Sequence, residues 1–381
     1  MEPAMTQTVT KKSLIDHFSA LDDPRQAWKV EYPLPEIMLL VLCATLAGAE
    51  TFVETALWGR KKLDFLRGLL PFKRGIPSHD ALNDVINALD AELFCACFSA
   101  WVEGLRESEP DIVAIDGKTS RRAHARQGHA LHTVSAWAAR QRLVLGQQAT
   151  EQKSNEITAI PLLLERLQLT GALVTIDAMG CQRAIAEAVI AKDADYLLAL
   201  KDNQRSLAGE VALFFADPAR RPEPHETIDA GHGRIETRRH FVSHDVDWLV
   251  SNRRFPGEPR FPGLKAIAMV EAVIETKATG ALTNARRYFI SSMALDAPLF
   301  AKAARAHWGI ENRLHWVLDV VFHDDLMRLR TQNGPKNMAT IKHMALNMVK
   351  SAPGKDSLRA KRKAAGWDDA FLMDIITYRT P

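Results

Sequence analysis

The chain has 381 residues, of which 47% are apolar and 25% are charged, and its formal net charge is +3. These values are ordinary for a soluble globular protein. No apolar run reaches the roughly 18 residues of a membrane span, and the N-terminus lacks the charged-then-apolar layout of a secretory signal. The four cysteines form no CxxC pair, so neither a zinc site nor a disulfide framework is indicated. We therefore expect a cytoplasmic protein without a membrane partner.

Residues 13 to about 107 are predicted to be mostly helical. Two long stretches carry apolar residues at helical spacing without strand-like alternation, and the segment between them contains two prolines and a glycine, which indicates a loop. Ser78 is placed to cap the helix that follows this loop. We therefore expect a helical N-terminal domain over 1–107. It is acidic, with 11 Lys and Arg against 16 Asp and Glu over 1–110.

The pattern changes at residue 111 and predicts strands alternating with helices. Three strands come first, the second and third joined by a hairpin near 139–141, and the order is then helix, strand, helix, strand. This order predicts a mixed sheet covered by helices. No glycine-rich dinucleotide-binding turn follows the first strand. The expected strands are 112–116, 131–138, 142–149, 172–177 and 195–200, and the expected helices are 155–167 and 181–192.

The rest of the chain divides by composition. Residues 108–204 would form the first part of an α/β core. Strand-like alternation and several prolines predict a β-rich insertion over 205–287, and a helix capped by Asp296 resumes the core over 288–350. The segment 351–381 is basic. Residues 301–381 together contain 14 Lys and Arg and 8 Asp and Glu. This excess is compatible with a nucleic-acid partner.

Two apolar runs each end on an aspartate, Asp116 and Asp177. If the two strands are neighbours, the carboxylates meet at one sheet edge, where their repulsion would favour a cation such as Mg²⁺. The alternative is that each aspartate only caps the turn after its strand. Glu311 is the candidate for a third acid, with His307 and His315 on the same helical face. The His-x3-Glu-x3-His spacing leaves a zinc site as a minor alternative.

Basic residues follow the first aspartate and recur in a predicted hairpin. Lys118, Arg121 and Arg122 belong to an expected basic loop, and Arg234, Arg238 and Arg239 lie in the segment GHGRIETRR. Such groups usually form a solvated face, but beside a carboxylate site they suit the phosphates of a nucleic acid. Trp308 and Trp316 are expected in the core rather than on a base-stacking surface.

Several long phrases of this sequence resemble bacterial insertion-sequence transposases of the H-repeat-associated branch, which are DDE transposases with a DDE-associated N-terminal domain. These phrases include IDGK, the run from HTVSAWAARQ to VTIDAMGCQ, DYLLALKDNQ, HGRIETRR, YFISS and HWGIENRLHWVLDVVF. The resemblance extends over nearly the whole chain. It implies a ribonuclease H-like core interrupted by the β-rich insertion, with Asp116, Asp177 and Glu311 as catalytic acids that hold two Mg²⁺ ions, or Mn²⁺ in their place.

The resemblance also implies a function and partners. The protein would cut at the terminal inverted repeats of an insertion sequence and join the 3′-OH ends to target DNA, acting as a homodimer or larger assembly, with nucleoid association when bound. The residues expected to contact DNA are Lys118, Arg121, Arg122, Lys201, Asn203, Arg234, Arg238, Arg239, Arg305 and Arg313. The alternatives are a catalytically silent transposon-derived DNA-binding protein and a host nuclease on the same fold.

One departure from the family pattern concerns the helix that carries Glu311. Many relatives have Tyr, Arg and Lys around the glutamate, as Y-x2-R-x3-E-x6-K. The corresponding positions here hold Ala304, His307 and Leu318. The roles of those three residues, including any part in a hairpin-forming pathway, are therefore not transferred to this chain.

Overall fold

The computed structural model describes residues 14–124, 130–150, 155–231, 233–250 and 260–377. The N-terminal region is helical, as the sequence predicts, and Ser78 caps a helix there by accepting a hydrogen bond from the Ala81 N–H. Helix α2 is buried along almost its whole length, so it is the centre of this region. The elements are α1 (Leu14–Ser19), η1 (Ala27–Lys29), α2 (Leu34–Leu46), α3 (Phe52–Lys61), α4 (Leu63–Arg67), α5 (His79–Ala88) and α6 (Ala91–Glu103).

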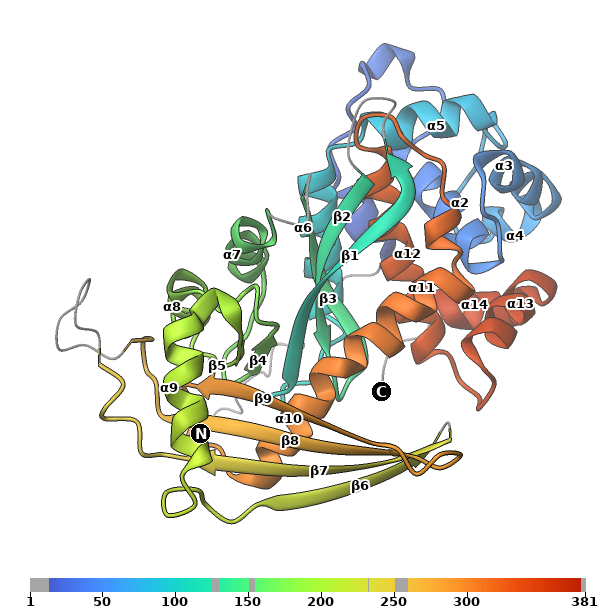
Figure 1. The fold of residues 1–381 in the computed structure, drawn as a ribbon. Helices are drawn as coiled ribbons and strands as arrows, with labels where there is room; N and C mark the ends of the chain where they lie inside the picture. Colours follow the sequence, from blue (N-terminus) through green and yellow to red (C-terminus); the bar gives the residue numbers. More distant parts are fainter. Residues whose placement is uncertain (1–13, 125–129, 151–154, 232, 251–259, 378–381) are drawn as a thin grey trace, which may run out of the picture.

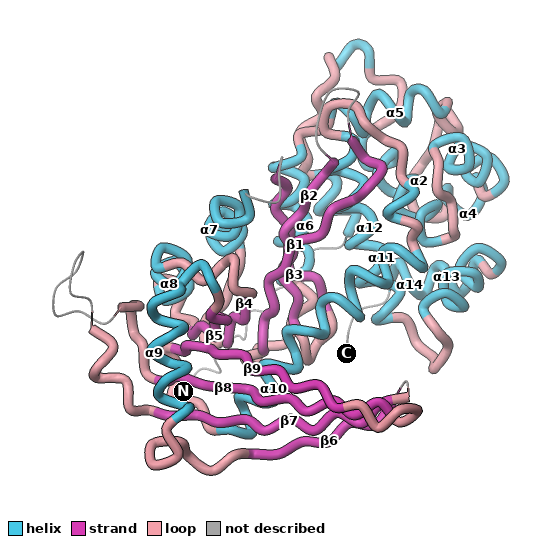
Figure 2. The backbone as a smooth tube through the Cα atoms, in the orientation of Figure 1, coloured by secondary structure: helices cyan, strands magenta, loops and turns pink. Residues whose placement is uncertain are grey.

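A nine-stranded mixed sheet forms the body of the molecule, with the order β3-β2-β1-β4-β5-β9-β8-β7-β6 (Figures 1 and 2). Strand β2 is antiparallel to β1 and β3, whereas β4 and β5 run parallel to β1. This arrangement of the first five strands is that of a ribonuclease H-like core, as expected. The strands are β1 (Ile112–His124), β2 (Ala130–Ala138), β3 (Leu143–Thr150), β4 (Leu173–Ile176) and β5 (Asp195–Leu200).

Two helical layers cover the sheet. Helices α7 (Glu156–Arg166), α8 (Arg183–Ile190) and α9 (Arg205–Ala216) pack on one face, and α10 (Ala297–Ile310) packs on the other. On the α10 face, Phe300 and Ala303 form a core cluster with Ile112 of β1 and Leu173 of β4. Because strand side chains alternate between faces, Asp116 and Asp177 lie on this α10 face as well.

The segment 205–287, expected as a β-rich insertion, holds one helix besides its strands. It begins with the helix α9, and its strands β6 (His225–Gly231), β7 (Arg234–Ser243), β8 (Ala266–Thr276) and β9 (Leu282–Ser291) are antiparallel to one another. Strand β9 pairs with β5, so these four strands extend the central sheet. Their backbone hydrogen bonds make the inserted strands continuous with the core.

The C-terminal helices pack against the N-terminal ones, and Figure 1 shows α12 lying beside α2, α5 and α6. The Asn337 amide donates to the carbonyls of Ile86 and Leu89 at 2.8 and 2.9 Å. Arg362 is buried and donates to the Thr45 carbonyl at 2.9 Å. Part of the basic C-terminal segment therefore stabilises the fold instead of facing solvent. The remaining elements are a π-helical turn (Glu311–His315), α11 (Trp316–Val321), η5 (Asp324–Leu326), α12 (Gly334–Ser351), α13 (Leu358–Trp367) and α14 (Asp369–Thr377).

Within the described residues, no single helix has the length and apolarity to cross a membrane. Helices α5 and α6 meet those criteria only together, as a pair bent by 88°.

Candidate active site

The two strand aspartates lie side by side. Strands β1 and β4 are parallel neighbours in which Ile115 pairs with Ile176, so the residues that follow, Asp116 and Asp177, are adjacent. The expectation that the two acids meet on neighbouring strands is therefore confirmed. Strand β1, however, does not end at Asp116 as expected: it continues to His124, because the antiparallel pairing with β2 goes on beyond the acid.

Each aspartate uses one carboxylate oxygen for the main chain. Asp116 Oδ1 accepts a hydrogen bond from the Gly117 N–H at 2.9 Å. Asp177 Oδ1 accepts from the N–H groups of Met179 and Gly180 at 3.0 and 3.2 Å. The capping role is thus real for Asp177, and it leaves Oδ2 of both side chains for another partner.

Glu311 and two histidines face these acids from the helix above. His307 Nδ1 is 3.1 Å from Thr175 Oγ1 on β4, and His315 Nδ1 is 3.6 Å from Asp116 Oδ2. Glu311 lines the same pocket as Asp116 and Asp177, which has a volume of about 200 Å³. It begins the π-helical turn between α10 and α11, a departure from α-helical geometry that is frequent at functional sites.

The charges closest to Asp116 in the pocket are negative. Burial, with the negative charges of Asp177, Glu156 and Glu311, raises the pKa of Asp116 to about 7, against the opposing effect of its hydrogen bond from the main chain. Burial also lowers the pKa of His307 and, helped by the positive charge of Lys118, lowers that of His315 to about 3. Both histidines are therefore neutral at pH 7, so they do not compensate the carboxylates.

The three carboxylates suit a metal ion in their chemistry but not in their present spacing. Three carboxylates around one pocket are hard oxygen donors, which Mg²⁺ prefers, and their mutual repulsion favours a bound cation. Yet no group of three or more His, Cys, Asp or Glu side chains among the described residues is close enough together to hold an ion. His307, Glu311 and His315 are therefore also too far apart, as they stand, to hold a zinc ion. Glu311 is exposed, so its carboxylate has room to move toward the aspartates.

A buried pair behind the acids was not foreseen from the sequence. On the face of the sheet opposite Asp116, His132 Nε2 lies 2.6 Å from Glu156 Oε1, and His132 Nδ1 lies 2.7 Å from Thr119 Oγ1. A Cβ atom at Gly117 would clash with both members of the pair. Position 117 therefore has to be glycine for the pair to lie against the strand that carries Asp116.

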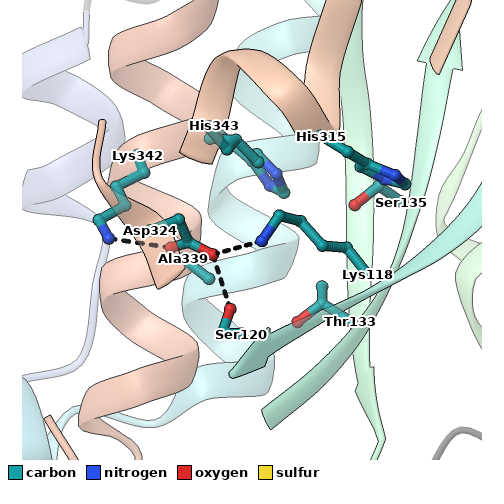
Figure 3. A pocket seen from close by; sticks show the side chains of 10 residues that line it. Lys118, Ser120, Thr133, Ser135, His315, Asp324, Ala339, Lys342 and His343 are labelled. Carbon is teal, nitrogen blue, oxygen red and sulfur yellow. Dashed lines mark hydrogen bonds and ion pairs between the residues drawn. The ribbon is translucent and has the colours of Figure 1, made fainter. Parts of the chain in front are cut away.

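Lys118 does not lie in a basic loop. Its ammonium is 2.7 Å from Asp319, 3.2 Å from Asp324 and 3.4 Å from Asp325, and only 10% of its side chain is exposed. Asp324 is also bound by Lys342 at 2.9 Å and by the Ser120 hydroxyl at 2.7 Å (Figure 3). We name Lys118, Ser120, Asp324 and Lys342 the lysine–aspartate cluster. Lys118 is committed to this cluster and is not available to DNA.

The hairpin arginines are divided between the two faces of the sheet. Arg238 is 2.6 Å from Asp229, which also pairs with Arg305 of α10 at 3.2 Å. Arg239 instead pairs with Glu226 at 3.0 Å on the opposite face. Arg234 shares the α10 face with Arg238, and no carboxylate in the described part of the chain lies within ion-pair distance of it. The three arginines expected to act together are therefore not equivalent.

The other residues expected at DNA have varied surroundings. The Asn203 amide donates to the carbonyl of Ala178, just after Asp177, so it holds the turn that follows that acid. Lys201 and Arg313 are exposed, and Arg122 is exposed at the far end of β1. The side chain of Arg121 lies outside the described residues.

Two pocket residues were missed or misplaced by sequence reasoning. Trp308 was expected in the core, but 44% of it is exposed and it lines the acid pocket. The guanidinium of Arg287 on β9 stacks on its ring at 4.5 Å from the ring centroid. Trp316 is also exposed, at 57%. Side chains alternate along β9, but the sequence does not show that β9 pairs with β5. Without that pairing, Arg287 could not be assigned to the α10 face.

The sequence and structure were compared with known proteins. A family model described as “Transposase DDE domain” matches residues 107–348, and one described as “DDE_Tnp_1-associated” matches residues 15–102. The chain is 38% identical over 376 residues to the “H repeat-associated putative transposase YhhI” of Escherichia coli (strain K12), covering 96% of this chain and 98% of that protein. It is 41% identical over 285 residues to the “Uncharacterized protein in dhlA 3'region” of Xanthobacter autotrophicus, covering 73% of this chain and 94% of that protein.

Among solved structures, the chain is similar to one in the cryo-EM structure of the piggyBac transposase synaptic complex with hairpin DNA. The TM-score is 0.40 and the sequence identity 11%, and the alignment covers 94% of this chain and 77% of that one.

Proposed function

Because this chain belongs to the DDE transposase family, we propose that it cuts DNA at the terminal inverted repeats of an insertion sequence and joins the freed 3′-OH ends to target DNA. The observation that carries the proposal is the position of Asp116 and Asp177, adjacent on parallel strands and facing Glu311 across one pocket. No protein nucleophile is needed for this chemistry: water would attack the phosphate at the element end and release the 3′-OH, which would then attack a phosphate of target DNA and displace a 3′-oxygen there.

We assign Asp116, Asp177 and Glu311 as the catalytic acids and as ligands of two divalent ions, Mg²⁺ or, in its place, Mn²⁺. Bound ions of this kind supply Lewis-acid activation and charge neutralisation at the scissile phosphate. The chain's own part is to present the carboxylates. Main-chain N–H groups orient the two aspartates through Oδ1. The exposed Glu311, on the π-helical turn, would supply the third carboxylate.

We propose that DNA approaches the α10 face. Arg287 and Trp308 at the pocket mouth offer a cation and an aromatic ring, the combination on which bases of single-stranded nucleic acid stack. Arg305, Arg234 and Lys201 are exposed and suited to backbone phosphates. Cutting two ends of one element in a concerted way requires at least a dimer, so we expect self-association on end DNA.

The test is to incubate the full chain with a duplex that carries the inverted repeats flanking its own gene, with Mg²⁺ or with EDTA, and to map the cut strands. We expect Mg²⁺-dependent cuts at the repeat ends and, with target plasmid added, joined products. Asp116→Asn and Asp177→Asn should give neither. Binding without cuts would favour the silent DNA-binding alternative, and nicking without joining would favour a host nuclease.

A further inference from the structure

His315 is the histidine that links the acid pocket to the lysine–aspartate cluster. Its Nδ1 atom lies 3.6 Å from Asp116 Oδ2, the carboxylate oxygen that the main chain leaves available. Its other face lines a small cavity together with Lys118, Asp324 and His343 (Figure 3). The side chain is only 12% exposed, so packing against neighbouring residues restricts the orientation of its ring.

The small cavity has polar walls whose hydrogen-bonding capacity is incompletely used. It measures about 10 Å³, close to the space that one water molecule needs. Three polar atoms of its lining residues are buried without a hydrogen-bond partner among the described residues, namely Thr133 Oγ1, His315 Nε2 and His343 Nδ1. Leaving such an atom unsatisfied costs about 1–3 kcal/mol. The cavity therefore suits one bound water, which needs two to four polar partners of this kind.

The hydrogen-bonding needs of the ring fix its tautomer. A neutral imidazole has one donor and one acceptor nitrogen, and the carboxylate at Asp116 can only accept while it is ionised. While Asp116 is ionised, its negative charge therefore favours the tautomer with the proton on Nδ1, which leaves Nε2 as the acceptor. Nearby Lys118 and Lys342 are held by Asp324 at 3.2 and 2.9 Å, which keeps their charges in place beside the neutral rings.

We propose that His315 is a positioning residue for Asp116: its Nδ1 faces Oδ2 of the acid at 3.6 Å, just beyond direct hydrogen-bond distance, and orients that oxygen electrostatically, while a water bound in the cavity fixes the ring from behind. The inference rests on the proposed function, because it treats Asp116 as a ligand of a divalent ion. Its consequence is that divalent-ion affinity depends on a side chain that does not itself touch the ion. Partners of this kind typically change metal affinity by about 10- to 100-fold.

The test uses Mn²⁺ binding to the full chain without DNA, followed by electron paramagnetic resonance of the free ion, so that no cleavage is needed. His315→Asn keeps an amide donor near the place of Nδ1, whereas His315→Gln places its amide near the place of Nε2. We expect His315→Ala and His315→Gln to weaken Mn²⁺ binding by about tenfold or more, and His315→Asn to remain within about threefold of the parent.

The matched control is His323→Asn. His323 is 36% exposed, pairs with Glu50 at 3.5 Å and has a positive φ of 50°, which asparagine tolerates. It should leave Mn²⁺ affinity unchanged. Unchanged affinity in His315→Ala would overturn the inference, as would equal losses in the Asn and Gln variants. If instead Asp116→Asn binds Mn²⁺ as the parent does, the assigned metal site itself is wrong, and the proposed function fails separately.

Discussion

Strand β1 contributes to two sites on the same face of the sheet. At one site the charges closest to the buried aspartate are other carboxylates, whereas the buried carboxylate of the other site is paired with lysines. At Asp116 the nearby charges are carboxylates, and burial with those charges raises its pKa to about 7. Two positions further along the strand, Lys118 enters the lysine–aspartate cluster. There the ammonium groups of Lys342 and Lys118 hold the pKa of buried Asp324 well below its usual range, despite the opposing effect of burial.

The difference separates structural acids from acids that await a ligand. Buried charges are normally paired, and Asp324 satisfies that rule within the protein. Asp116 does not, because the charges close to it are carboxylates, so its compensation has to come from outside the chain. Asp319 already contacts Lys118 at 2.7 Å, whereas Glu311 has no cationic partner among the described residues, and for this reason we propose Glu311 as the third acid. Strongly perturbed carboxylates in a pocket are candidates for function for this reason.

The largest expected effect follows from that choice. Glu311→Gln keeps the shape of the side chain but removes a metal-binding charge, so we expect DNA cleavage to fall by about 10³-fold or more, equivalent to roughly 4 kcal/mol. Binding of end DNA should stay within about threefold. Asp319→Asn is the matched control and should retain cleavage. Strand mapping by gel electrophoresis checks both variants, and the reverse outcome would place the third acid at Asp319.

Removing the acid at the centre of the lysine–aspartate cluster should unfold the protein more easily. Asp324→Asn leaves Lys118 and Lys342 buried without their shared partner, a change that costs about 3–5 kcal/mol of unfolding free energy. Urea denaturation followed by circular dichroism measures it. Asp325→Asn is the comparison, since this acid is 27% exposed and lies farther from Lys118, at 3.4 Å. We expect it to cost about 1 kcal/mol or less, and equal losses would contradict the central role of Asp324.

The raised pKa of Asp116 predicts a pH dependence of stability in divalent-free buffer. Between pH 4 and 7 the folded state holds a proton on Asp116 that the unfolded state has lost, so the free energy of unfolding falls as pH rises through this window. The shift is about three pKa units, at about 1.4 kcal/mol each, so the stability of Asp116→Asn relative to the parent should increase by about 4 kcal/mol between pH 4 and pH 8. Thermal or urea unfolding at both pH values measures the difference. A constant difference between the two proteins would show that Asp116 is not perturbed.

The arrangement of the two acids could be predicted from sequence because it depends on local pattern and topology. Apolar runs ending on Asp116 and Asp177 indicate strands. Their adjacency was only a condition at that point, because β2, β3 and α7 lie between β1 and β4 in the chain, and the family resemblance made it an expectation. Ribonuclease H-like topology then follows from the order of elements. The helix α9 was missed because the prolines and alternating residues after it led us to treat 205–287 as one β-rich unit.

The role of Lys118 could not be predicted, because its partners depend on distant pairings. Asp324 lies 206 residues away in the chain and reaches Lys118 only through the packing of η5 against β1. The exposure of Trp308 was missed for a related reason: helical spacing shows which residues share a face, but not that this face opens onto a pocket. Charge and hydrophobicity identify candidates, and the fold decides whether a candidate meets a partner or solvent.

The smallest expected effect tests the same distinction among the hairpin arginines. Arg234 is exposed on the α10 face with no carboxylate partner among the described residues, whereas Arg239 pairs with Glu226 at 3.0 Å on the other face. An unpaired arginine can neutralise a phosphate without first breaking an ion pair. Arg234→Ala should therefore weaken end-DNA binding modestly and reduce the slope of log K against log salt by about 1.

Arg239→Ala is the matched control, since it removes an equal charge from the same strand. We expect it to change affinity by less than about twofold and to leave the salt slope close to that of the parent. Fluorescence anisotropy over a range of salt concentrations measures both quantities. If the two variants reduce the slope equally, the field of the whole hairpin attracts DNA regardless of face. If Arg239 alone matters, DNA approaches the sheet from the side of α9, and the α10 face has been wrongly assigned as the DNA surface.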